Sequence, residues 1–451
     1  MNIIIIGCGK VGEALAEQLN EKGNNITVVD SDSKRVSDIT DRLDVMGVVG
    51  NGATHTVQED AGVEKADLLI AVTGSDELNL LCCTVAKIAG NCQTIARIRN
   101  PEYSSEAPYL RDKLGLAMVI NPEAAAAAEI ERVLRFPSAL KIDTFARGRV
   151  QLIRFRLSED ARIVGMSVRE MATKLDANVL VCTVERGEEA HIVKGDFVFE
   201  KRDVVSIIAT PANASDFFKK INRETYPVKD VMIVGGGDLA QYLCRSLVRS
   251  GISIKLIDRD PARCDELCSQ LSEPSIICGD GSDRSLLLEE GIRKADAFAA
   301  LTGQDEENVL LSLFAKTAGC GKVVTKIDRP DLDDIIRHLD LDSTIYPKRI
   351  TADIITRYVR AMKNSEGSNM ETLYNVIPGK VEAAEFTVRA GSPVLGIPLM
   401  KMSIKKDVLV AAIIRNDVAL IPRGADVIME GDRVVIVSGL SDLDDISDIL
   451  A

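Results

Sequence analysis

The sequence predicts an α/β protein with two Rossmann-like doubly wound parallel-sheet domains, each followed by a small α+β domain. Three observations support this fold class. The chain repeats itself, apolar strands alternate with helices in the first part of each copy, and a glycine-rich turn follows the first strand of each copy. At roughly 150 residues per domain, 451 residues correspond to about three domains. The repeat raises the expected number to four.

The repeat extends over most of the chain. Residues 3–12 are echoed by residues 231–240, and Gly50-Asn51-Gly52 by Gly279-Asp280-Gly281. Further matches keep the same order and nearly the same spacing, and they pair 65–67 with 294–296, 73–74 with 302–303, and 76–79 with 305–308. Because a solenoid would need shorter and more numerous units, we infer a duplication of one whole unit, at about 1–222 and 223–451.

The first part of each copy alternates between strands and helices. In the first copy the pattern predicts strands at 3–6, 26–29, 46–49, 68–72 and 94–98, and helices near 11–22, 34–44, 57–61 and 76–89. The strands are almost wholly apolar. Strands of this kind, separated by helices, are typical of a parallel sheet that is covered on both faces.

The second part of each copy consists of short strands separated by turn residues. We expect them at 150–157, 179–185, 191–192 and 204–209, and at 384–388, 408–414, 420–421 and 433–437, in a mixed or antiparallel sheet. A helix that starts at Pro122 and ends before Pro137 links the two parts. The expected domains are nucleotide-binding domains at 1–120 and 228–346, linker helices at 121–140 and 347–369, and small C-terminal domains at 141–222 and 370–451.

Composition narrows the possible functions. Hydrophobic residues make up 46% and charged residues 27%, which is an ordinary globular balance. The net charge of −13 argues against nucleic acid as the main partner and against a polybasic membrane anchor. No apolar run approaches the ~20 residues of a spanning helix, so a membrane role would need a membrane-embedded partner. Without an export signal, the ten cysteines are expected to be reduced thiols in a cytosol.

A glycine motif carries the first functional signal. Gly7-x-Gly9-x-x-Gly12 follows a strand and opens a helix, and Asp30 ends the second strand. The first glycine permits a tight turn, the second lets the backbone approach a phosphate, and the third lets the helix pack on the strand. An acid at this place can accept both ribose hydroxyls and repels a 2′-phosphate. The motif therefore predicts NAD, ATP or ADP, and the alternative is a nucleotide fold that has lost its ligand.

The second copy carries a variant of the same motif. Its equivalents are Gly235, Gly236, Gly237, Asp238, Leu239 and Ala240, with Asp258 in the place of Asp30. Alanine is tolerated at the third glycine position. Loss of the ligand is a stronger alternative for this copy than for the first.

Two further features lie at the carboxyl edge of the predicted sheet. Thr73-Gly74 ends the fourth strand, and Thr302-Gly303 is its counterpart; both can line a nucleotide or begin a capped helix. Arg97 and Arg99 alternate on the fifth strand, so they point to one face and suit a polyphosphate, although surface ion pairing is the alternative. The second copy has Lys326 and Asp328 there. We therefore expect different sites, the first being better built for ATP or ADP.

Enzymatic machinery is not evident in the sequence. No HExxH, GxSxG, Walker A or zinc-ligand pattern occurs. This favours a nucleotide sensor that binds without turnover. Two alternatives remain open: an NAD-dependent dehydrogenase with an unidentified substrate, and a redox-sensing scaffold that depends on Cys8 in the glycine turn.

The tandem copies, the glycine turn, Asp30, the segment 73–79 and the strand 96–99 together resemble the TrkA family of potassium uptake regulators, whose chains contain two RCK (KTN) units. The resemblance covers essentially the whole chain. It implies a cytoplasmic regulatory subunit, peripheral on the inner face of the membrane. As a homo-oligomeric ring, it would gate a membrane-embedded potassium transporter subunit of the TrkH/TrkG type.

The same resemblance implies NAD(H), ATP and ADP as ligands. The implied contact residues of the first copy are Gly7, Cys8, Gly9, Lys10, Val11, Asp30, Thr73, Gly74 and Arg97, and those of the second are Gly235, Gly236, Gly237, Asp238, Leu239, Asp258 and Thr302. In the mechanism that we expect, the terminal phosphate of ATP bridges Arg97 and Arg99, whereas ADP leaves both unpaired.

Overall fold

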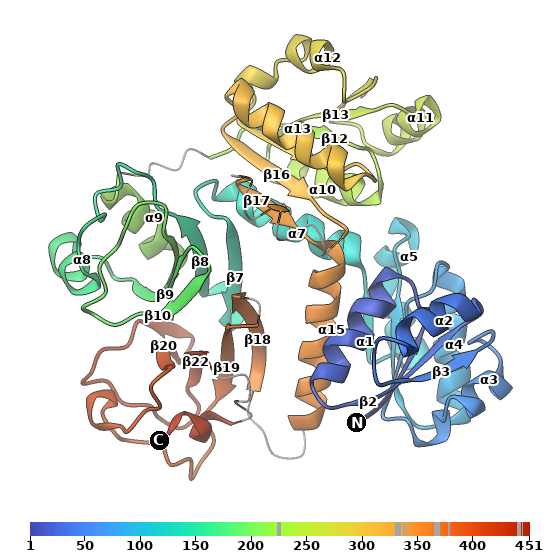
Figure 1. The fold of residues 1–451 in the computed structure, drawn as a ribbon, viewed down its shortest axis with the longest axis horizontal. Helices are drawn as coiled ribbons and strands as arrows, with labels where there is room; N and C mark the ends of the chain where they lie inside the picture. The colour runs from blue at the N-terminus through green and yellow to red at the C-terminus, as the bar shows by residue number, and fades with distance from the viewer. Residues whose placement is uncertain are drawn as a thin grey trace. The chain divides into compact units, whose positions relative to one another are not determined.

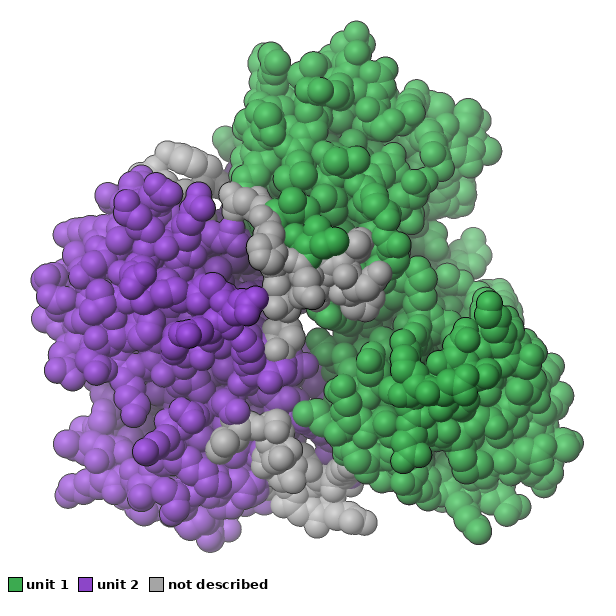
Figure 2. All heavy atoms as spheres, viewed as in Figure 1, with its two compact units in different colours: residues 1–131, 229–356 green, residues 132–228, 357–451 purple. Residues whose placement is uncertain are grey.

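The computed structural model describes the chain except for residues 223–226, 330–334, 337–338, 340, 365–369, 378, 440–442 and 444. The described residues form four sheets (Figure 1). The chain divides into two compact units, which Figure 2 shows in different colours. Unit 1 contains residues 1–131 and 229–356, and unit 2 contains residues 132–228 and 357–451. Each unit thus combines corresponding parts of both copies, whereas the repeat alone indicated two copies in succession.

The first sheet of unit 1 has the strand order β3-β2-β1-β4-β5-β6, and its strands are parallel. Its strands are β1 (Asn2–Ile6), β2 (Asn25–Asp30), β3 (Met46–Val49), β4 (Leu68–Ala71), β5 (Gln93–Arg97) and β6 (Met118–Ile120). The helices between them are α1 (Lys10–Glu21), α2 (Ser33–Thr40), α3 (His55–Asp60), α4 (Asp76–Ala89), α5 (Pro101–Ser105) and α6 (Ala107–Leu114). All four residues of β4 are buried, as expected for a strand covered on both faces.

The second sheet of unit 1 repeats this topology in the order β14-β13-β12-β15-β16-β17. Its strands are β12 (Asp230–Val234), β13 (Ser253–Asp258), β14 (Ser275–Cys278), β15 (Ala297–Ala300), β16 (Lys322–Lys326) and β17 (Ser343–Ile345). Its helices include α10 (Asp238–Arg249), α11 (Pro261–Gln270), α12 (Arg284–Glu289) and α13 (Asp305–Ala318). In both sheets the strand order reverses beside the first strand, which is where open α/β sheets bind ligands.

Unit 2 contains two antiparallel sheets, which we call the first and second C modules. The first has the strand order β10-β9-β11-β8-β7. Its strands are β7 (Lys141–Phe145), β8 (Val150–Arg156), β9 (Leu180–Arg186), β10 (Glu189–Ile192) and β11 (Val204–Ala209). It also contains helices α8 (Val168–Leu175) and α9 (Pro211–Lys220). The second has the equivalent order β18-β19-β22-β20-β21, with β18 (Met370–Ile377), β19 (Val381–Thr387), β20 (Val408–Arg415), β21 (Val418–Leu420) and β22 (Arg433–Ser438).

The two C modules share a hydrophobic core. One cluster of buried side chains draws on both, including Phe145 and Val150 from the first module and Val376 and Val435 from the second. The rings of Phe145 and Tyr374 meet edge to face at 4.9 Å, and the Tyr374 hydroxyl donates to the carbonyl oxygen of Thr144 at 2.9 Å. Each sheet is therefore buried on this face by its counterpart from the other copy.

The predicted fold class is confirmed, and several details differ from the sequence expectation. In the described residues each parallel sheet has six strands rather than five, because β6 and β17 add an edge strand. The sequence pattern also did not predict strands β7 and β18. The helix expected at 34–44 ends at Thr40, and that expected at 57–61 begins at His55. The linker helices are α7 (Pro122–Arg135) and α15 (Pro347–Asn364). Among the described residues, no helix combines the length and apolar character that crossing a membrane requires.

Candidate nucleotide-binding site

The first glycine turn has the geometry that the motif requires. Gly7 adopts a φ of +106°, and a Cβ there would lie 2.9 Å from the backbone nitrogen of Thr73. A Cβ on Gly12 would lie 1.8 Å from the carbonyl oxygen of Gly7, so α1 packs directly on the turn. By contrast, no described atom lies within 4 Å of the Cβ position of Gly9. The space beside Gly9 is where a phosphate would approach the backbone.

The start of α1 offers donors to an anion. Among the described residues, no side chain caps the helix that begins after Gly9. The first amide groups of a helix lack partners within it, and the helix dipole favours negative charge there. The Lys10 side chain is exposed beside this turn, whereas the Val11 side chain is buried and can offer only its backbone.

The turn in the second copy repeats most of this geometry. Gly235 has a φ of +101°, and the Cβ position of Gly237 has no described atom within 4 Å. The differences lie in the neighbouring side chains. Arg263, on α11, donates from Nε to the carbonyl oxygen of Gly236 at 2.7 Å, and its Nη2 lies 3.6 Å from Asp238. Sequence reasoning did not identify Arg263, which crowds the second turn.

The acid at the end of the second strand holds the glycine turn in both copies. The Oδ2 atom of Asp30 accepts from the amide of Cys8 at 2.7 Å, and Oδ2 of Asp258 accepts from the amide of Gly236 at 2.6 Å. The other oxygen of each accepts from the amide two residues further on, in Asp32 and Asp260. Since a carboxylate oxygen can accept more than one hydrogen bond, both acids keep capacity for ribose hydroxyls.

Thr73 belongs to a buried network that the sequence did not reveal. Its backbone amide and its hydroxyl both donate to Oδ1 of Asn79, at 2.7 and 2.8 Å. Asn79 is fully buried, and its Nδ2 donates to the carbonyl oxygen of Arg97 at 2.9 Å. Asn79 thus joins the end of β4 to the end of β5. In the second copy Asn308 makes the same bonds with Thr302 and Lys326.

A second buried acid fixes the chain after the fifth strand. Oδ2 of Asp76 accepts from the amides of Arg99 and Asn100, both at 2.8 Å. Asp305 accepts from the amide of Asp328 at Oδ1 and from that of Arg329 at Oδ2, both at 2.9 Å. The repeat pairs Asp76 with Asp305, and this identity was the signal that could have marked them as positioning residues. These two acids fix the backbone from which the side chains of Arg99 and Asp328 extend.

The two arginines of the first copy lie together at this edge. Arg97 donates from Nη2 to the carbonyl oxygen of Thr73, and Arg99 donates from Nη2 to that of Gly74 at 2.7 Å. Within the described part of the chain, the buried Nε atoms of both arginines have no hydrogen-bond partner. Burial, and then the charge of Arg99, lower the pKa of Arg97. Two adjacent cations with unused donors form a site for an anion.

The second copy neutralises the corresponding cation. Nζ of Lys326 lies 2.9 Å from Oδ2 of Asp328, and Nζ of Lys348 lies 3.6 Å from Oδ1 of the same carboxylate. Although burial opposes ionisation, Lys326 and Lys348 hold the pKa of Asp328 below its usual value. The side chains therefore differ between the copies as the sequence indicated. The first edge presents two arginines beside the carboxylate of Glu123, and the second presents the carboxylate of Asp328 between two lysines.

Cys8 can be tested as a redox centre. Burial, and then the neighbouring charge of Asp30, raise its pKa to about 12. Because the thiolate is the reactive form, we expect Cys8 to be alkylated by iodoacetamide at neutral pH far more slowly than the exposed Cys268 and Cys278. Mass spectrometry of peptides from a time course measures the three rates. Labelling of Cys8 as fast as that of Cys268 would support the redox-scaffold alternative.

Comparisons with known proteins show the family and the fold of the chain. The chain matches the family model described as the TrkA-N domain at residues 3–122 and 231–347, and that described as the TrkA-C domain at residues 152–222 and 383–451. It is 32% identical over 450 residues to the Trk system potassium uptake protein TrkA homolog 1 of Methanosarcina mazei, covering 97% of each chain. It is 31% identical over 450 residues to the TrkA homolog of Archaeoglobus fulgidus, covering 100% of each. Among solved structures, the GsuK channel bound to NAD aligns with a TM-score of 0.64 at 17% identity, over 97% of this chain and 76% of that one.

Proposed function

We infer that this chain, which belongs to the TrkA family, is the nucleotide-responsive regulatory subunit of a potassium transport system. Nucleotide binding is inferred from two neighbouring features. The buried Nε atoms of Arg97 and Arg99 lack hydrogen-bond partners among the described residues, and no described side chain caps the start of α1. Both features favour an anion that extends from the glycine turn to the end of β5. ATP and ADP fit this description.

We assign different ligand preferences to the two sites. In the first, the glycine turn, Asp30 and the two arginines would hold an adenine nucleotide with its terminal phosphates at Arg97 and Arg99. In the second, Asp258 and the backbone of the turn remain available, whereas Asp328 opposes a terminal phosphate. The second site is therefore suited to a ligand with fewer charges, such as NAD(H), or to permanent vacancy.

Regulation requires that one nucleotide stabilise one conformation more than another does. The first site supplies a physical basis, because a γ-phosphate can bridge two guanidinium groups that otherwise repel each other, whereas ADP is one phosphate shorter. We propose that this difference is passed to a membrane-embedded potassium transporter. The subunit would act from the cytoplasmic face, as a homo-oligomeric ring, and without chemical turnover. The family match gives the dehydrogenase alternative no support.

Isothermal titration calorimetry on the full chain tests nucleotide binding. We expect ATP, ADP and NADH to bind, and NADPH to bind more weakly than NADH because Asp30 and Asp258 repel a 2′-phosphate. Asp30→Asn and Asp258→Asn each keep an acceptor for the turn while removing the charge, so each should reduce this preference at its own site. The nucleotide should be recovered unchanged. A folded chain that gives no heat with any of these compounds would rule the proposal out.

A further inference from the structure

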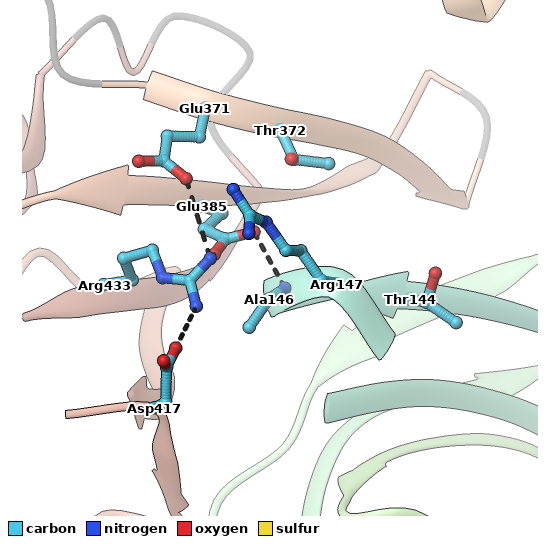
Figure 3. A pocket seen from close by; sticks show the side chains of 8 residues that line it. All are labelled: Thr144, Ala146, Arg147, Glu371, Thr372, Glu385, Asp417 and Arg433. Atoms are coloured by element: carbon cyan, nitrogen blue, oxygen red, sulfur yellow. Dashed lines mark hydrogen bonds and ion pairs between the residues drawn. The ribbon is translucent and has the colours of Figure 1, made fainter. Parts of the chain in front are cut away.

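A polar pocket of about 370 Å³ lies between the two C modules, inside unit 2 (Figure 3). Its lining includes Ala146 and Arg147 from the first module and Glu371, Glu385, Asp417 and Arg433 from the second. Its volume falls within the range of small-molecule sites. Its lining is polar and charged, whereas the surrounding shared core is apolar. The nucleotide sites in unit 1 contribute none of these residues.

Glu385 supplies an unused acceptor in this pocket. Its side chain is only 2% exposed, and Oε2 accepts from the backbone amide of Ala146 at 3.1 Å. The other oxygen, Oε1, accepts no hydrogen bond within the described part of the chain. Nη1 of Arg433 is 3.5 Å away, which is close enough for charge attraction but without hydrogen-bond geometry. A buried carboxylate oxygen in this state favours a ligand that brings a donor.

Arg147 supplies an unused cation. Its guanidinium makes no hydrogen bond or ion pair with any described residue, and Figure 3 shows its side chain extending toward Glu385. Arg433 is already engaged, because it lies 3.4 Å from Asp417 and 4.0 Å from Glu371. Ala146 and Arg147 both have positive φ, at +50° and +57°, which is uncommon for residues other than glycine. Such backbone often marks a functional segment.

The charges of the lining select the ligand class. Three carboxylates and two guanidinium groups line the pocket, and Arg149, outside the lining, pairs with Asp417. The charges therefore nearly balance and offer no net attraction to a dianion such as a phosphate monoester. A simple cation would meet Arg433 and leave Arg147 unpaired. A ligand with one anionic and one cationic group satisfies both unused positions. We propose that this pocket binds a free α-amino acid, whose carboxylate pairs with Arg147 and whose ammonium group donates to Oε1 of Glu385.

Thermal-shift and calorimetric measurements on the full chain test this assignment. Each standard amino acid is added at millimolar concentration, together with propionate, ethylamine and inorganic phosphate. We expect at least one amino acid to bind saturably, and the three single-charge or anionic probes to bind more weakly. Arg147→Asn and Glu385→Gln should each lower that affinity by about tenfold or more, since each removes one charge-assisted contact.

Arg202→Asn is the matched control. Arg202 also has a left-handed backbone, with a φ of +65°, but it pairs with Glu159 outside the pocket. This variant should bind the amino acid as the wild type does. The proposal fails if no amino acid binds, if Arg147→Asn binds normally, or if phosphate or propionate binds as well as the amino acid. Should Glu385→Gln not fold, Arg147→Asn decides alone. Nucleotide titrations report on unit 1, so the two proposals can fail separately.

Discussion

Replacing Arg97 with glutamine is expected to weaken ATP binding to the first site by about tenfold or more while changing ADP affinity much less. A hydrogen bond to a charged group contributes about 1.5–3 kcal/mol, and the γ-phosphate is the group that distinguishes the two nucleotides. Glutamine is shorter than arginine, so the contact from Nη2 to the carbonyl oxygen of Thr73 is lost as well, and the titration with ADP controls for that loss. Calorimetry with ATP and with ADP measures the affinity ratio directly.

Lys326→Gln is the control at the corresponding position of the second copy. Because Asp328 lies 2.9 Å from Lys326 and already neutralises it, this change should leave the ATP/ADP affinity ratio nearly as it is in the wild type. An unchanged ratio in Arg97→Gln would instead show that the terminal phosphate does not reach the arginine pair. In that case the two sites could not be distinguished by their charge at this edge.

Stability gives an independent check on the arginine pair. In the absence of an anion, Arg97 and Arg99 repel each other, and the lowered pKa of Arg97 reflects burial together with that repulsion. Arg97→Gln relieves that repulsion but also removes the attraction of Arg97 to Glu123 and Asp76, so this variant should unfold at a temperature close to that of the wild type. A variant that loses ATP affinity while keeping its stability has lost a binding contact. One that loses both has lost a structural contact.

The sequence predicted the parallel sheets and the glycine turns well, because short-range patterns determine both. A strand such as 68–71 is apolar on both faces, and the turn at Gly7 needs a positive φ that the motif encodes. Edge strands were harder to predict. Strand β7 contains Lys141, Asp143 and Thr144, so it lacks the apolar run that identified the central strands.

Long-range features could not be predicted from local patterns. The side chain of Asn79 joins two strand ends, which depends on the folded sheet rather than on spacing. The pocket in unit 2 joins Ala146 to Glu385 across more than half of the chain. One signal was present but unused. Strand β20 is apolar on both faces, with Val410 to Ile414 all buried, and such a strand needs a second covering layer, which the other C module provides.

Replacing Gly12 with alanine is expected to destabilise the first parallel-sheet domain by about 2–3 kcal/mol and to abolish nucleotide binding at its site. The added Cβ would lie 1.8 Å from the carbonyl oxygen of Gly7, which is backbone and cannot rotate away. Helix α1 must then move off the turn, and its amide groups move with it. Urea unfolding followed by circular dichroism measures the loss of stability, and calorimetry measures the loss of binding.

Gly9→Ala separates the two effects of that change. No described atom lies within 4 Å of the new Cβ, and the φ of Gly9 is −72°, which alanine adopts freely. This variant should therefore unfold like the wild type, yet bind ATP poorly, because its methyl group occupies the space that a phosphate would need. At the position equivalent to Gly12, the third glycine of the motif, the second copy carries Ala240, so helix α10 already accommodates a Cβ there. If Gly9→Ala binds ATP normally, the nucleotide does not rest on this turn, and the site must be sought elsewhere on the sheet edge.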